Sequence, residues 1–148
     1  MAIIEFSNEF FMHEALKEAR KAFDKDEVPV GAVVVCQNVV IARAHNLTER
    51  LNDVTAHAEM QAITAAAAYL GGKYLDGCSL FVTVEPCPMC AAALFWAQLG
   101  VLVYGTKDEK RGFRRYKPDL LHPKTKVIEG ILEDDCRNLM VEFFNRKR

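Results

Sequence analysis

The chain has 148 residues, 51% of them hydrophobic and 26% charged, which is typical of a globular domain and excludes an intrinsically disordered chain. Its formal net charge of −1 predicts no general affinity for polyanions, so a contact with nucleic acid would need a local basic patch. No apolar run approaches the roughly 20 residues of a membrane span, and the start has no signal-peptide pattern, so we expect a cytoplasmic protein without membrane contact.

The first half of the chain alternates between helical and strand patterns. Apolar side chains recur at helical spacing over residues 8–24, and Ser7 or Asn8 is a suitable N-cap. Two apolar strands that form a hairpin follow, then a polar loop and an Ala-rich helix that Thr55 could cap. The expected elements are a helix at 8–24, strands at 31–36 and 39–42, a loop at 46–53 and a helix at 56–69.

The second half continues the alternation. The expected elements are a strand at 79–84, a helix at 88–98, a strand at 101–104, an irregular segment at 106–125, a strand at 126–129 and a helix at 132–146. This order predicts one α/β domain over residues 1–148, with helices on both faces of a mixed sheet. The hairpin strands should be antiparallel, and strands separated by a helix should be parallel.

Two short motifs, each placed just before a predicted helix, contain the candidate chemistry. They read TAHAE at 55–59 and VEPCPMC at 84–90. Together they offer three ligands for a borderline metal such as zinc: His57, Cys87 and Cys90. A closed structural zinc site normally uses four protein ligands, so three indicate a catalytic site with one open position for water, whose pKa zinc lowers to about 7.

The spacing of these residues agrees with a shared site at two helix starts. Cys87 and Cys90 are three apart and would share a face of a helix, for which Pro88 suits the first position. His57 and Glu59 are two apart, so they can meet at one metal only if their helix points its N-terminal end at it. Glu59 could then take protons from the water and return them.

Other interpretations of the cysteines remain open at this stage. A lone C-x-x-C pair is often a redox pair, and a zinc-stabilised domain without catalysis would need a fourth protein ligand or a missing base. Cys36, Cys78 and Cys136 are scattered along the chain, so we expect small buried apolar residues and no disulfide framework.

Taken together, the two motifs match H-x-E…P-C-x-x-C, the signature of the zinc nucleobase deaminases. Over nearly its whole length the chain resembles the cytidine deaminase-like superfamily, most of all the bacterial tRNA-specific adenosine deaminases. Further segments that carry the resemblance are PVGAV at 29–33, Asn46, Asp53, KDEK at 107–110, and the C-terminal segment with GIL at 130–132 and a basic end at 146–148. The resemblance implies a three-layer α/β/α fold with a mixed sheet of about five strands.

The resemblance also implies roles for particular residues. His57, Cys87 and Cys90 would bind one zinc ion per chain, and Glu59 would be the catalytic proton shuttle. Asn46, Asp108 and Lys110 would contact the substrate: Asn46 by hydrogen bonds to the target base, and the other two from a polar loop beside it. Relatives build their sites across two subunits, so a homodimer is expected.

The implied substrate is the adenosine at the wobble position of the tRNA anticodon loop. Residues 106–117 carry six basic side chains against two acidic ones, and Phe113 and Tyr116 could stack on splayed bases. Two features differ from the family pattern: Val54 replaces the usual proline before the zinc histidine, and the loop after Asp108 is unusually basic. The alternative is guanine or cytosine as a free base or nucleoside, since PMC at 88–90 and FWA at 95–97 are similar to guanine deaminases.

Overall fold

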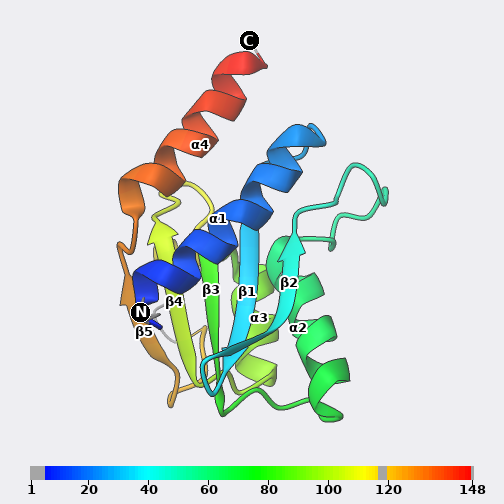
Figure 1. The fold of residues 1–148 in the computed structure, drawn as a ribbon, viewed down its shortest axis with the longest axis vertical. Coiled ribbons are helices and arrows are strands. Elements are labelled where there is room, and N and C mark those ends of the chain that lie inside the picture. Colours follow the sequence, from blue (N-terminus) through cyan, green and yellow to red (C-terminus); the bar gives the residue numbers. More distant parts are fainter. Residues whose placement is uncertain (1–5, 117–119, 148) are drawn as a thin grey trace, which may run out of the picture.

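The computed structural model describes residues 6–116 and 120–147 (Figure 1). The helices are α1 (Asn8–Asp24), α2 (Ala58–Leu70), α3 (Pro88–Trp96), the short 3-10 helix η1 (Phe113–Arg115) and α4 (Glu133–Arg146). The strands are β1 (Gly31–Cys36), β2 (Val39–His45), β3 (Cys78–Val84), β4 (Val101–Thr106) and β5 (Lys126–Glu129). The order of helices and strands is the one expected from the sequence, with η1 added inside the segment expected to be irregular.

The five strands form one mixed sheet in the order β2-β1-β3-β4-β5. β1 is antiparallel to both of its neighbours, whereas β3, β4 and β5 are parallel to one another. β2 therefore runs in the same direction as β3 and β4, and the carboxyl ends of all three lie at one edge of the sheet. In open α/β sheets, ligands bind at the edge where parallel strands end.

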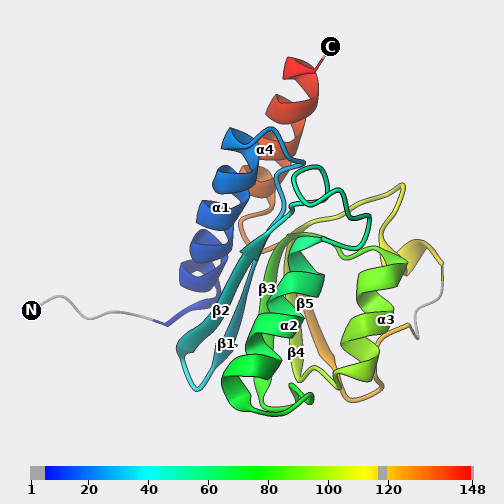
Figure 2. The ribbon, with the colours of Figure 1, turned by 90° about the vertical axis from the view of Figure 1, so that its right-hand side faces the viewer.

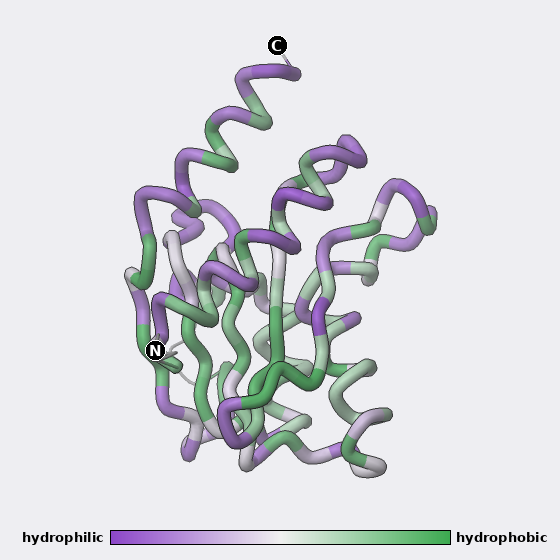
Figure 3. The backbone as a smooth tube through the Cα atoms, in the orientation of Figure 1, coloured by the Kyte–Doolittle hydropathy of each residue, from purple (hydrophilic) through white to green (hydrophobic). Residues whose placement is uncertain are grey.

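Helices cover both faces of the sheet, which confirms the three-layer arrangement. Figure 2 shows α1 and α4 on one face and α2 and α3 on the other. A hydrophobic core lies on each face of the sheet, and alternate residues of β1 point into one or the other. Val33 and Val35 pack on the face with α1, and Ala32 and Val34 on the face with α2 and α3. The central strands are correspondingly apolar, while much of α4 is hydrophilic (Figure 3). Among the described residues, no helix combines the length and the apolar character that crossing a membrane requires.

The helix starts agree with the sequence at α1 and differ at α2. Ser7 caps α1, because its hydroxyl accepts a hydrogen bond of 3.1 Å from the N–H of Phe10. Thr55 does not cap α2: its N–H and hydroxyl both donate to Asp53 Oδ1, at 2.8 and 2.7 Å. This local turn competes with the helix, so α2 begins two residues later and His57 takes the N-cap position.

Gly31 lets α1 lie directly on β1. A Cβ atom at this position would stand 2.1 Å from the carbonyl oxygen of Ala15 and 2.3 Å from the N of Ala19, both backbone atoms of α1. We expect Gly31→Ala to lower the free energy of unfolding by about 3 kcal/mol, since helix and sheet would have to separate. Chemical denaturation of this variant beside Gly72→Ala provides the measurement, because a Cβ at Gly72 meets nothing within 4 Å. Equal stabilities of the two variants would contradict this close packing.

Candidate metal centre

The structure brings His57, Cys87 and Cys90, here called the metal trio, together at the sheet edge where β2 and β3 end. His57 is the N-cap residue of α2, and Cys87 is the N-cap residue of α3, so both helices begin at this point. Pro88 takes the first position of α3, where the missing N–H is not needed. Cys90 follows in the first turn of α3, three positions after Cys87, so the two cysteines are neighbours at the start of the helix. The two helix starts therefore converge as the sequence predicts.

The distances within the metal trio suit a tetrahedral zinc ion. Nδ1 of His57 lies 3.6 Å from Sγ of Cys87 and 3.5 Å from Sγ of Cys90. With bonds of about 2.3 Å to sulfur and about 2.1 Å to nitrogen, a tetrahedral zinc separates nitrogen from sulfur by about 3.6 Å. The ligand atoms all lie within 4.8 Å of one another, so one ion can reach all three. Three protein ligands leave one coordination position free.

The electrostatics of the site favour thiolate sulfur. Hydrogen bonding from Cys90, with a further contribution from His57, lowers the pKa of Cys87 to about 4. The same interaction raises the pKa of Cys90, and the nearby sulfur of Cys87 raises the pKa of His57. The Cys87 thiolate lies where two helices begin, and their N-terminal ends stabilise its negative charge. A thiolate is the form of cysteine that binds zinc.

Glu59 lies in the first turn of α2 and is buried. Burial raises the pKa of its carboxyl to about 7, because it disfavours the charged form, and hydrogen bonds from its own backbone N–H and from Cys90 act in the opposite direction. Glu59 stands two positions after His57, at the same start of α2. A carboxyl that titrates near neutral pH can both accept and release a proton, which is the property that a general acid–base group needs.

Asn46 follows β2 directly, at the same sheet edge as the metal trio. Its side chain is buried and already contacts backbone: Nδ2 donates to the carbonyl of Val28 at 3.3 Å, and Oδ1 accepts from the N–H of Thr48 at 3.3 Å. Each of these atoms can form a second hydrogen bond. Asn46 is thus held in a fixed orientation while retaining one donor and one acceptor.

Asp108 and Lys110 lie in the loop after β4, which also leaves the sheet at this edge. Asp108 is half-buried, and its Oδ1 accepts hydrogen bonds from the N–H groups of Lys110 and Arg111, at 3.1 and 3.0 Å. This turn leaves Oδ2 of Asp108 without a hydrogen bond from any described residue, and the side chain of Lys110 is exposed.

The sequence profile of the cytidine and deoxycytidylate deaminase zinc-binding region matches residues 6–106, a span that contains the metal trio and Glu59. The chain belongs to this deaminase family. The loop after β4 and the helix α4 lie beyond the matched residues, so their contribution to the deaminase site has to be judged from the structure itself.

Within the deaminase family, the chain is similar to curated tRNA-specific adenosine deaminases. The one from Agrobacterium fabrum is 45% identical over 143 residues, covering 93% of this chain and 94% of the relative. The one from Bacillus subtilis is 42% identical over 146 residues, covering 95% and 91%. The similarity thus includes the segments outside the matched profile.

Two solved structures of deaminases are similar as well. One comes from a study of A-to-I editing by tRNA:A34 deaminases at the wobble position of transfer RNA; it has 44% identity and a TM-score of 0.81, covering 88% of this chain and 98% of that chain. The other, a guanine deaminase from Nitrosomonas europaea, has 25% identity and a TM-score of 0.84, covering 95% and 86%. The mixed five-stranded sheet is the fold of these deaminases.

One expectation about the deaminase site is wrong. Phe113 was expected to stack on bases, but its side chain is only 2% exposed and packs edge-on against Tyr104 in the core, with the ring centroids 6.3 Å apart. The first residue of η1 therefore anchors the loop. Tyr116, at 57% exposed, is free to contact a ligand. Lys117, the last basic residue of the expected patch, lies outside the described residues.

The basic end of α4 lies beside α1 and not beside the loop after β4. Arg146 and Lys147 both pair with Asp26, just after α1, and Arg146 stacks on Phe23 at 4.4 Å from the ring centre. Figure 2 shows this end of α4 next to α1, with α3 and η1 on the opposite side of the sheet. The two basic segments thus do not form one continuous patch. Arg148 lies outside the described residues.

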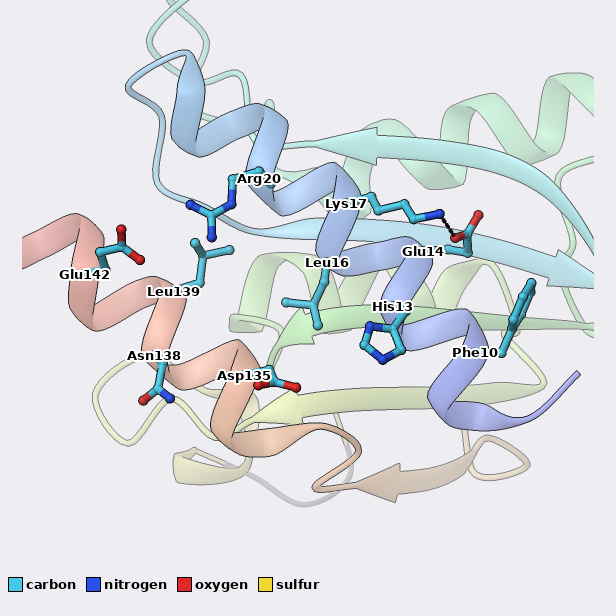
Figure 4. A pocket seen from close by; sticks show the side chains of 10 residues that line it. All are labelled: Phe10, His13, Glu14, Leu16, Lys17, Arg20, Asp135, Asn138, Leu139 and Glu142. Carbon is cyan, nitrogen blue, oxygen red and sulfur yellow. Dashed lines mark ion pairs between the residues drawn. The ribbon is translucent and has the colours of Figure 1, made fainter. Parts of the chain in front are cut away.

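A groove between α1 and α4, with a volume of about 690 Å³, has no candidate site residue in its lining (Figure 4). It mixes apolar side chains such as Leu16 and Leu139 with charged ones such as Glu14 and Arg20. A second cavity of about 500 Å³ lies beside α3, lined by Phe95, His122 and neighbouring residues. Neither contains the metal trio, so the chemistry assigns the deaminase site to the sheet edge and not to these hollows.

Sequence reasoning missed two buried carboxylates near the site, Glu27 and Glu85. Glu85 lies inside the second motif, between Val84 and Pro86, and a charged residue in an otherwise apolar strand end was a signal that could have been used. Glu27 lies in the charged turn after α1, where its sequence neighbours gave no indication that it would be fully buried.

Proposed function

We propose that residues 1–148 form one zinc-dependent deaminase domain that converts adenosine to inosine at the wobble position of tRNA. The observation that carries the proposal is the metal trio with Glu59 beside it, in a chain that is 45% identical over 93% of its length to a tRNA-specific adenosine deaminase. The similarity to guanine deaminase is a weaker guide to the substrate, since it stands at 25% identity.

The reaction exchanges the amino group of the base for an oxygen. One zinc ion per chain, held by His57, Cys87 and Cys90, would supply the Lewis acid that activates water near neutral pH. Glu59 accepts a proton from the attacking water, delivers it to the ring nitrogen next to the reacting carbon, and then assists the departure of the amine. Water and the adenine base give hypoxanthine and ammonia, so Glu59 ends in the state in which it began.

The remaining site residues would hold the nucleotide. The free donor and acceptor of Asn46 match the edge of a purine, which offers both types of group. Asp108 would accept a hydrogen bond from the sugar, and Lys110 would neutralise a phosphate. All three lie in the loops that follow β2 and β4, where a flipped base would enter the sheet edge.

The loop after β4 has the charge that an RNA backbone requires. Five exposed basic side chains stand there against the two acidic residues Asp108 and Glu109; they are Lys107, Lys110, Arg111, Arg114 and Arg115. Tyr116 adds an exposed aromatic ring on which an unpaired base can stack. Because the whole chain has a net charge of −1, binding to RNA requires a local excess of positive charge, and this loop has one.

A homodimer in the cytoplasm, where tRNA is modified, completes the proposal. Trp96 at the end of α3 is 76% exposed, and exposed aromatic side chains of this size are typical of protein interfaces. Sedimentation equilibrium measures the molecular mass in solution: the wild type should be a dimer, and Trp96→Ala should dissociate more readily.

The substrate is tested by measuring inosine in an anticodon stem-loop with adenosine at the wobble position, beside free guanine, cytosine and adenosine. We expect conversion of the stem-loop alone. Binding of the stem-loop should weaken at least about tenfold between 50 and 200 mM salt, because several phosphate contacts release counterions. Turnover of a free base with no activity on RNA would refute the tRNA assignment.

A further inference from the structure

Two buried glutamates close to the site have no part in the proposed chemistry. Glu27, in the turn between α1 and β1, is 0% exposed, and Glu85, between β3 and α3, is 6% exposed. Burying a carboxylate is unfavourable unless hydrogen bonds compensate for the lost water. Each of these carboxylates accepts two hydrogen bonds, and all four come from backbone N–H groups of loops.

Glu85 holds the loop after β4. Oε1 accepts from the N–H of Asp108 and Oε2 from the N–H of Arg114, both at 3.1 Å. The loop passes so close that a Cβ at Gly112 would lie 2.2 Å from Oε2, and the N–H of Phe113 donates to the carbonyl of Pro86 at 2.9 Å. The loop therefore packs closely around Glu85, which stands two positions before Cys87.

Glu27 holds the loop between β2 and α2 in the same way. Oε1 accepts from the N–H of Glu49 at 3.0 Å, and Oε2 accepts from the N–H of Arg50 at 2.8 Å. This loop begins with Asn46 and ends at His57. Asn46 adds a contact to the same turn, because its amide donates to the carbonyl of Val28, next to Glu27.

The two loops border the metal trio from either side. One follows β2 and the other follows β4, so both leave the sheet at the edge where α2 and α3 begin. Hydrogen bonds to a carboxylate are stronger than those between neutral groups, and a buried carboxylate fixes two N–H groups at once. Loops fixed in this way lose less conformational entropy when they bind a substrate.

We propose that Glu27 and Glu85 are positioning residues, which hold residues 46–54 and 107–115 in the shape that receives the RNA. The inference rests on the proposed function for its substrate, but the loop ordering itself does not depend on it. Neither carboxylate touches the reacting atoms, so their loss should weaken substrate binding more than the chemical step.

The variants Glu85→Gln and Glu27→Gln test this, with Glu14→Gln as the matched control. Glutamine keeps the size of the side chain but replaces one acceptor oxygen with an NH₂ group that faces an N–H donor. Glu14 pairs with the side chains of Lys17 and Arg43 on α1 and β2 and touches neither loop. We expect KM for the anticodon stem-loop to rise about tenfold or more in the two test variants, with kcat changed less than about threefold.

Backbone hydrogen exchange makes the loop ordering testable without any substrate. The N–H groups of Asp108 and Arg114 should exchange about tenfold faster in Glu85→Gln, and those of Glu49 and Arg50 in Glu27→Gln, while zinc content and the exchange of the β-sheet stay as in the wild type. Unchanged exchange of these four groups would overturn the inference even if the protein deaminates tRNA. Faster exchange with unchanged KM for the stem-loop would overturn the positioning role. If the variants show faster exchange while the wild type has no activity on RNA, the loop ordering would be supported and only the proposed substrate refuted.

Discussion

Replacing Glu59 with alanine should lower kcat by a factor of about 10³ or more and leave the zinc in place. A general acid–base group contributes roughly 10² to 10⁴ in rate, and Glu59 is the buried carboxyl beside the metal trio. Zinc should remain because its proposed ligands, His57, Cys87 and Cys90, are unchanged. The thermal midpoint should stay equal or rise, since the substitution removes a carboxyl from a buried position.

Inosine formation under single-turnover conditions, together with metal analysis of the same sample, provides the measurement. Glu59→Gln is the matched variant, because it keeps the shape and can hydrogen-bond but cannot accept a proton at the pH of the assay. Both variants should form inosine at least about 10³ times more slowly than the wild type, with about one zinc per chain. Normal activity in either one would show that another group moves the proton.

Replacing Cys90 with serine should remove both the metal and the activity. Cys90 is fully buried and is one of the two proposed sulfur ligands, and a serine hydroxyl is a much weaker zinc ligand than a thiolate. A ligand that binds only the folded state stabilises it, so losing the zinc should also lower the thermal midpoint by several degrees. The wild type treated with a strong chelator should show the same lowered midpoint, and zinc should restore it.

Cys136→Ser is the control, since Cys136 is buried equally well but lies in α4 on the opposite face of the sheet. This variant should lose some stability and keep its zinc and its activity. If Cys90→Ser retained stoichiometric zinc, the trio would not be the metal site. If Cys136→Ser lost zinc as well, the effect of Cys90→Ser would reflect general unfolding.

Most of the architecture was predictable because it depends on local patterns. The apolar repeat of residues 8–24 gave both ends of α1, and the motif residues Pro88 and Cys87 gave the start of α3. β2 runs on to His45, three residues past the predicted end, because Arg43, Ala44 and His45 pair with β1 whatever their polarity. Strand length here is set by the partner strand, which a local pattern does not contain.

The part of the site that was predictable from the sequence is the part made of residue types that are rare at such spacing. A histidine and two cysteines at fixed spacing predicted a cluster that the structure does bring together, whereas the roles of these residues and of Glu59 stay predictions. Phe113 was assigned wrongly because an aromatic residue among basic ones has the same local sequence whether it faces the solvent or the core. Glu27 was missed because its partners, the N–H groups of Glu49 and Arg50, lie more than twenty positions further along the chain. Only tertiary structure brings such contacts together.

The way Gly112 and Phe113 secure the loop after β4 has an evolutionary consequence. Gly112 has no room for a side chain, and Phe113 fills part of the interior, so exchanges at these two positions would disturb the whole segment. Lys110, Arg111 and Arg114 point outward and can mutate at little cost to folding. Natural selection could therefore alter which nucleic acid this enzyme prefers by substituting the exposed side chains of the loop, while Gly112 and Phe113 keep its backbone in place.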